Sequence, residues 1–232
     1  MADDTRAAFN RRFLQTAKGY YDNNTVTANI LALRWGLAPD DQVSRVFSHV
    51  VTKMTAQGTP HISTGVLGTQ EIMRGLTDYG RGDIAYQIAA NTTYPSWGFM
   101  VAHGATTIWE LWNGDTANPR MNSGNHIMLL GDLIIWYYQY LAGIRQTADS
   151  QAYRHIVLRP YIPDGLTHVN ASYRSPYGDI VSRWRIEANR FCWQFTIPAN
   201  TTAEVYVPQA DGSYRQAHYG SGTYEVSVPA RQ

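Results

Sequence analysis

The chain has 232 residues, a formal net charge of +1 and 16% charged residues, which excludes a nucleic-acid binder that acts by bulk charge and a disordered tail. Its 12% aromatic content, with 7 Trp and 16 Tyr, fits an aromatic core and also a surface that stacks against flat, hydroxylated ligands. No apolar run approaches the roughly 20 residues of a membrane span and the N-terminus lacks a signal-peptide core, so we expect no membrane partner and, as written, a cytoplasmic chain.

The first 145 or so residues follow the period of amphipathic helices. Asp40 and Asp41 are expected to cap the N-terminus of a helix that closes at Gly58. Short connections predict antiparallel helical hairpins laid side by side. The predicted helices cover residues 5–21, 25–39, 40–58, 68–80, 81–91 and 124–144. The apolar stripe of the last one consists of Ile127, Leu130, Ile134, Tyr138 and Leu141.

After Ile144 the pattern alternates with a period of two, and Pro, Gly and Asn punctuate it. Short strands at spacings near ten residues predict an antiparallel β-sandwich. The small, polar stretch 146–152 marks the linker, so we expect a helical domain over residues 1–147 and a β-sandwich domain over residues 148–232. The predicted strands cover residues 154–160, 166–175, 178–188, 190–198, 202–209 and 223–230.

Cys192 is the only cysteine, so the chain can form no intrachain disulfide. It lies in the alternating stretch RFCWQF, residues 190–195. We therefore expect Cys192 to be a small buried hydrophobe rather than a reactive thiol.

Glu110 is the one formal charge in YPSWGFMVAHGATTIWELW, residues 94–112. If residues 106–112 are helical, Trp109 and Trp112 lie beside the carboxylate, and partial desolvation by the indoles raises its pKa. Such a group can exchange a proton with water or a leaving oxygen near neutral pH. Two structural readings compete with this one, namely an exposed Glu on an amphipathic helix and a Glu paired with an Arg.

A second polar cluster, MNSGNH at residues 121–126, lies at the N-terminus of the last predicted helix. Asn122, Asn125 and His126 suit hydroxyl recognition, whereas helix capping is the better interpretation for Asn122 and Ser123. His103 and His126 together with Glu110 have a spacing that fits no usual zinc pattern, so we expect no metal site and no cofactor.

These residues carry a resemblance to a known family. The run from STGVLGTQEIMRGL through YPSWGFMVAHGATTIWELW to MNSGNH and YQYLAGI resembles the C-terminal half of the catalytic domain of bacterial α-L-rhamnosidases, glycoside hydrolase family 78. TANILALRWGLAP resembles an upstream helix of the same family, and IVLRPYIPDGLTHVNASYRSPYGDIVSRW resembles its closing β-sandwich. The resemblance covers almost the whole chain.

The resemblance implies an (α/α)6 toroid, here partial, followed by a β-sandwich, and hydrolysis of terminal α-L-rhamnosides with inversion. Glu110 would be the general base that activates water, and His126 would contact the sugar. Further substrate contacts are placed at Trp97, Trp109, Trp112, Asn122, Asn125 and His103, with no tryptophan assigned to a specific subsite.

The family's general acid lies in an acidic segment upstream of everything in this sequence, and no equivalent of it is found here. About six or seven helices are predicted, whereas a full toroid has twelve, so apolar helix faces are left without neighbours. The chain is then either a fragment that dimerises through this open edge or a stable piece of a longer chain. We predict a truncated form that assembles as a symmetric homo-oligomer and covers the open edge. The carboxyls that a partner copy could contribute are Glu71, Asp78, Asp83, Asp115 and Asp132.

Two alternatives to a truncated rhamnosidase remain open. The chain could bind rhamnose or a related deoxysugar without turnover, because it keeps the indoles, His126 and the asparagine cluster. An opened, Trp-rich groove with one carboxylate could also perform a different small-molecule hydrolysis, since fold alone does not fix function.

Overall fold

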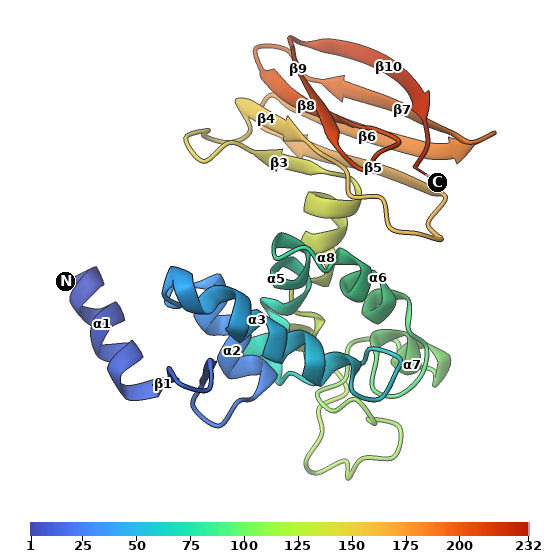
Figure 1. Ribbon diagram of the computed structural model, residues 1–232. Helices are drawn as coiled ribbons and strands as arrows, with labels where there is room; N and C mark the ends of the chain where they lie inside the picture. Colours follow the sequence, from blue (N-terminus) through green and yellow to red (C-terminus); the bar gives the residue numbers. More distant parts are fainter. Residues whose placement is uncertain (232) are drawn as a thin grey trace. The chain divides into compact units, whose positions relative to one another are not determined.

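The computed structural model describes residues 1–231, which divide into two compact units, residues 1–134 and residues 135 onward. The first unit is helical and the second is built from two β-sheets, which confirms the predicted order of helical hairpins followed by a β-sandwich (Figure 1). The domain boundary expected after residue 147 stays a prediction. No helix in the described part of the chain is long and apolar enough to cross a membrane.

The helices are short, and several end at glycines with positive φ. The α-helices are α1 Ala2–Phe13, α2 Val26–Arg34, α3 Asp40–Thr55, α4 Val66–Thr69, α5 Ile72–Asp78, α6 Gly82–Ala90, α7 Trp97–Ala102 and α8 Leu133–Trp136. The 3₁₀ segment η1 Ile127–Leu130 precedes α8, and the π-helical turn η2 Tyr137–Leu141 follows it.

Two helical hairpins, α2/α3 and α5/α6, form the centre of the first unit. Thr25 caps α2 by accepting a hydrogen bond from the Ala28 amide at 3.1 Å. Gly75 lets α5 approach α2 closely, because a Cβ at this position would lie 2.6 Å from the Ile30 side chain. The buried core around this contact includes Ile30, Leu33, Val46, Val50, Ile72, Met73, Leu76, Ile84 and Ile88.

The helix expected over residues 5–21 is wrong beyond Phe13. The chain turns there into a hairpin of two short strands, β1 Leu14–Gln15 and β2 Tyr20–Tyr21. Gly19 takes a positive φ of 73°, and Arg45 donates to two carbonyls of the turn at 3.2 and 2.9 Å. Arg45, from the distant helix α3, therefore donates to carbonyls that would accept backbone amides if the first helix continued.

The expected caps of α3 are also wrong in detail. The N-cap residue is Pro39, and no side chain makes a capping hydrogen bond. Asp40 and Asp41 lie in the first turn instead, where their negative charge interacts favourably with the helix dipole.

The long apolar helix expected over residues 124–144 is broken at Gly131. Gly131 has a φ of +61°, and a Cβ there would lie 2.2 Å from the Thr69 carbonyl oxygen, so tertiary contact fixes the break. The break also changes the buried face. Ile127 is 60% exposed and Ile134 45% exposed, whereas the buried side chains are Leu129, Leu133, Trp136, Tyr140 and Leu141.

All six predicted strands are present, with two further strands that the pattern did not reveal. The first sheet has the order β10-β7-β6-β5 and the second has the order β3-β4-β8-β9. Within the described residues every pair in these sheets is antiparallel except β4 with β8, which is parallel. The bounds are β3 Ile144–Gln146, β4 His155–Leu158, β5 His168–Ser175, β6 Gly178–Glu187, β7 Arg190–Ile197, β8 Thr202–Pro208, β9 Tyr214–Tyr219 and β10 Gly222–Pro229.

The two sheets share one aromatic core. Trp184 of β6 pairs across the strands with Trp193 of β7, and both indoles are buried at 2% exposure. The indole N–H of Trp184 donates to the Leu141 carbonyl at 2.7 Å, and that of Trp193 donates to the Ser182 hydroxyl at 3.0 Å. Both buried indole N–H groups therefore have a hydrogen-bond acceptor inside the core, as buried polar groups require.

Cys192 is not the buried hydrophobe that the sequence suggests. Phe191 and Trp193, its neighbours on β7, point into the core, so the strand period places Cys192 on the opposite face. Its thiol lies 3.5 Å from the Ser227 hydroxyl on β10 and is half-buried.

Candidate functional site

The candidate site is built from two loop segments that lie side by side, residues 107–111 and residues 122–126. The His126 amide donates to the Ile108 carbonyl at 2.6 Å, and the Glu110 amide donates to the Ser123 carbonyl at 2.9 Å. The Thr107 hydroxyl also donates to the Gly124 carbonyl. These contacts bring together two segments that the sequence predicts separately, the one with the candidate general base Glu110 and the one with the candidate sugar contact His126.

The conditional helix over residues 106–112 does not form, because this stretch is irregular and its hydrogen bonds go to the second segment. One Glu110 carboxylate oxygen, Oε2, accepts from the Ser123 amide at 2.8 Å. The other, Oε1, lies 3.9 Å from Nδ1 of His126. The Glu110 side chain is 41% exposed and that of His126 is 23% exposed, so the pair faces solvent with one carboxylate oxygen anchored.

The three tryptophans named with this site have different environments. Trp97 is buried in the core at 5% exposure, and its indole N–H donates to the Leu129 carbonyl at 3.0 Å. Trp112 packs edge-on against Trp97, with ring centroids 5.6 Å apart. Trp109 covers Gly114, where an added Cβ would lie 2.6 Å from the indole. The indoles thus shape the loop, and Trp97 has no free face for a ligand.

The remaining polar candidates act on the loop backbone. Asn122 accepts the Leu111 amide through Oδ1 at 3.0 Å, next to Glu110. The Asn125 amide donates to the Ser123 hydroxyl at 3.2 Å. The expectation that Asn122 and Ser123 cap a helix is wrong, since the N-cap of η1 is His126 and no side chain makes a capping hydrogen bond there.

His103 is the C-cap residue of α7 and does not belong to this pair of segments. Its ring stacks on Phe99 at a centroid distance of 3.8 Å, and its Nδ1 lies 2.9 Å from the Phe99 carbonyl oxygen. Within residues 1–231, no group of three or more His, Cys, Asp or Glu side chains is placed to hold a metal ion.

An ion-pair network that sequence reasoning missed engages three other carboxylates of the helical unit, Glu71, Asp78 and Asp132. Asp132 is fully buried and accepts from the amides of Met73 and Arg74 at 3.3 and 3.0 Å, so it caps the start of α5 from a distant segment. Burial raises the pKa of the Asp132 carboxyl, and hydrogen bonds and charge from Arg74 oppose that rise.

The same network engages two more carboxyls through arginine. Arg34 bonds Glu71 at 3.0 Å and also pairs with Asp78, while Arg74 bonds Glu71 at 3.2 Å. Asp83 is held separately by Arg81 at 2.7 Å. Of the five carboxyls considered as partners for Glu110, four are therefore committed to arginine, and Asp115 is exposed. Sequence spacing gave no signal for pairs such as Arg34 with Asp78.

Helical hairpins are followed by a β-sandwich, and a carboxylate and an imidazole are presented from adjoining loops of the helical part. The family profile described as bacterial alpha-L-rhamnosidase 6 hairpin glycosidase domain matches residues 1–141, and that of the bacterial alpha-L-rhamnosidase C-terminal domain matches residues 143–222. The chain therefore belongs to the bacterial α-L-rhamnosidases.

Characterised relatives agree with this assignment. The chain is 33% identical to an alpha-L-rhamnosidase of Streptomyces avermitilis over 93% of its own length, and 34% identical to one of Formosa agariphila over 87%. It spans 22% of the length of each of these relatives. The crystal structure of the Streptomyces avermitilis alpha-L-rhamnosidase complexed with L-rhamnose matches 96% of the chain with a TM-score of 0.89 at 32% identity, and the chain covers 23% of it.

Proposed function

We propose that this chain supplies the general base and part of the sugar-binding surface for hydrolysis of terminal α-L-rhamnosides with inversion. The observation that carries the proposal is the Glu110 carboxylate, anchored at Oε2 by the Ser123 amide and 3.9 Å from His126 at Oε1. Oε1 is the oxygen left to take a proton from water. A rhamnose complex of a relative 32% identical to this chain supports the choice of sugar.

Inversion needs a second carboxyl, a general acid, which stands roughly 6.5–9.5 Å from the base and leaves room for the water. Glu71, Asp78, Asp83 and Asp132 are held by arginines, so none of them is a spare acid in the described residues. We propose that the acid is none of these four carboxyls and comes either from further chain or from a second copy. Asp115 is the one member of the earlier group of five that forms no ion pair with an arginine in the described residues, and it is exposed.

The test is release of p-nitrophenol from p-nitrophenyl α-L-rhamnoside by the wild-type chain, Glu110→Gln and Glu187→Gln. Loss of a general base lowers kcat by about 10²–10⁴-fold, so we expect Glu110→Gln to be inactive within detection. Glu187→Gln removes an exposed carboxylate from the β-sandwich and should keep the wild-type rate. Equal rates for wild type and Glu110→Gln would remove Glu110 from the mechanism.

Sugar binding without turnover is the second candidate, and the engagement of the other carboxyls by arginine favours it. Calorimetry with L-rhamnose distinguishes the two candidates. Heat of binding that depends on His126, without release of p-nitrophenol, supports the binding module. Absence of heat at millimolar rhamnose argues against it.

We further propose that a second copy of the chain covers the exposed apolar side chains of the helical unit. Several large apolar residues there are 52–74% exposed, and a second copy that buried them would remove apolar surface from water. They include Trp35, Leu67, Val101, Met121, Ile127 and Met128.

A further inference from the structure

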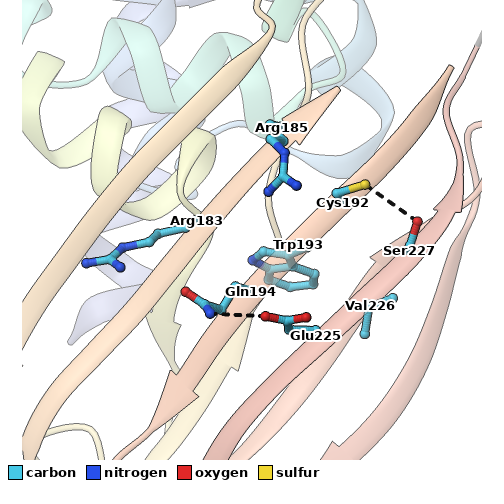
Figure 2. Close-up of a pocket in the computed structure, with 8 residues that line it drawn as sticks. All are labelled: Arg183, Arg185, Cys192, Trp193, Gln194, Glu225, Val226 and Ser227. Carbon is cyan, nitrogen blue, oxygen red and sulfur yellow. Dashed lines mark hydrogen bonds between the residues drawn. The ribbon is translucent and has the colours of Figure 1, made fainter. Parts of the chain in front are cut away.

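The outward face of the sheet β10-β7-β6-β5 carries a polar groove that is separate from the Glu110 loops. The groove has a volume of about 340 Å³ and is lined by residues of β6, β7 and β10 (Figure 2). Its floor is formed at Trp193 and Val226, whose side chains belong to the core side of the sheet. The walls therefore consist of the side chains that alternate with these two.

Strand register arranges the walls in two rows. One row runs across the strands from Arg185 through Cys192 to Ser227. The other row runs from Arg183 through Gln194 to Glu225. Both arginines thus lie on β6 and Glu225 lies on β10. The backbones of these two strands are two strand spacings apart, which is about 10 Å.

Both guanidinium groups are held from outside the groove through Nε. The Arg183 Nε donates to Asn170 Oδ1 at 2.8 Å, and the Arg185 Nε donates to Glu187 Oε2 at 2.8 Å. In the described part of the chain no ion pair engages Arg183, and the pair to Glu187 uses Nε of Arg185. The terminal Nη groups of an arginine can donate two hydrogen bonds to one carboxylate. Here the hydrogen bonds of the Nε atoms already orient both arginine side chains.

The far side of the groove offers hydrogen-bond partners for hydroxyl groups, and the Ser227 hydroxyl there already accepts from Arg190 Nε at 2.8 Å. Gln194 lies 3.3 Å from Glu225, and Ser227 lies 3.5 Å from the Cys192 thiol. Glu225 would repel a small free anion, but it accepts hydrogen bonds from hydroxyl groups. A fitting ligand therefore carries an acid group at one end and hydroxyl groups at the other. A pyranose ring with an exocyclic carboxylate spans this distance.

We propose that this groove binds a hexuronate residue, with its carboxylate on Arg183 and Arg185 and its hydroxyls on Gln194, Glu225 and Ser227. The site is independent of the proposed glycosidase activity, because it lies on the β-sandwich and uses no residue of the Glu110 loops. It would give the chain a means to bind acidic glycans.

The test compares methyl β-D-glucuronide with methyl β-D-glucoside, which differ at one carboxylate, by calorimetry on the full chain. We expect the glucuronide to bind at millimolar concentration and the glucoside at least about tenfold more weakly. The double variant Arg183→Gln/Arg185→Gln should lose this preference. Arg215→Gln, an exposed arginine on β9 of the other sheet, should keep it. Equal binding of both sugars, or no glucuronide binding at tens of millimolar, overturns the proposal.

Glu225→Gln separates a sugar-acid site from a simple anion site. Removing the Glu225 charge should strengthen acetate binding and weaken glucuronide binding, since acetate loses only a repulsion while glucuronide exchanges a charged hydroxyl acceptor for a weaker, neutral one. A parallel increase for both ligands contradicts the hexuronate assignment.

Cys192 supplies a second, independent readout because it is the only cysteine and lines the groove. We expect glucuronide to slow modification of its thiol by N-ethylmaleimide, and glucoside at the same concentration to leave the rate unchanged. Equal effects of the two sugars on the rate count against the site.

Discussion

At the scale of single residues, buried polar groups connect segments that are far apart in the sequence. Tyr21 is 1% exposed, and its hydroxyl donates to Asn10 Oδ1 at 2.6 Å. Asn10 in turn donates to the Leu37 carbonyl at 2.8 Å, so this chain of bonds fastens α1 to the turn after α2. Asn29 completes the arrangement by accepting the Tyr21 amide at 2.8 Å.

This environment gives a stability prediction with a defined pH window. Burial raises the pKa of Tyr21 from 10.0 to about 12. The folded state therefore holds its proton more tightly, and the resulting stability is fully present below pH 10 and is lost as the pH rises toward about 12. Tyr21→Phe should cost about 1 kcal/mol at pH 8 through the lost hydrogen bond, and the difference from wild type should shrink above pH 10.

Urea unfolding at pH 8 and at several pH values above 10 measures this difference. Tyr177→Phe is the control, because Tyr177 is 36% exposed and its variant should follow the wild-type pH profile. A Tyr21→Phe curve parallel to wild type throughout would contradict the assignment.

At the scale of elements, close backbone approach decides where segments break. Gly131 separates η1 from α8, and Thr69 of α4 occupies the space that a side chain would need. The break directs Asp132 to the start of α5, where it accepts two backbone amides. Gly131 therefore fixes where η1 ends, and η1 is the 3₁₀ segment that has His126 as its N-cap.

Replacing this glycine should be among the most damaging small changes in the helical unit. Gly131→Ala combines a strained positive φ with a Cβ 2.2 Å from a carbonyl oxygen, so we expect a loss of about 3 kcal/mol or more. Gly124→Ala is the matched control, because no atom lies within 4 Å of its added Cβ. Thermal unfolding should give a much lower Tm for Gly131→Ala alone, and similar Tm values for both variants would refute this account.

At the scale of the whole molecule, the proposal of a second copy rests on the exposed apolar residues of the helical unit. Light scattering at micromolar concentration should give a mass above that of the 26.1 kDa chain. Ile127→Asp/Met128→Asp places charge on two of these residues, which are 60% and 52% exposed, and should shift the mass toward a monomer. A wild-type chain that is monomeric at micromolar concentration contradicts the proposed second copy.

The fold could be predicted largely from local pattern, because strand alternation and helical periodicity report which side chains face a core. Cys192 shows what the pattern leaves undecided. The alternation of RFCWQF is visible in the sequence, but only the packed sheets show that Phe191 and Trp193 face the core and Cys192 faces away from it. The site was predicted only as separate motifs. Glu110 was expected in a helix beside indoles, whereas hydrogen bonds to residues 122–126 hold it in a loop.

The sequence by itself determined the helical part, the β-sandwich and the family, since periodicity and long motif runs are local properties of the chain. Tertiary structure alone decided the break at Gly131, the engagement of Asp132 by α5 and the approach of His126 to Glu110. These features depend on contacts between residues 16 to 62 positions apart, and pairings at such separations leave no periodic trace in a single sequence.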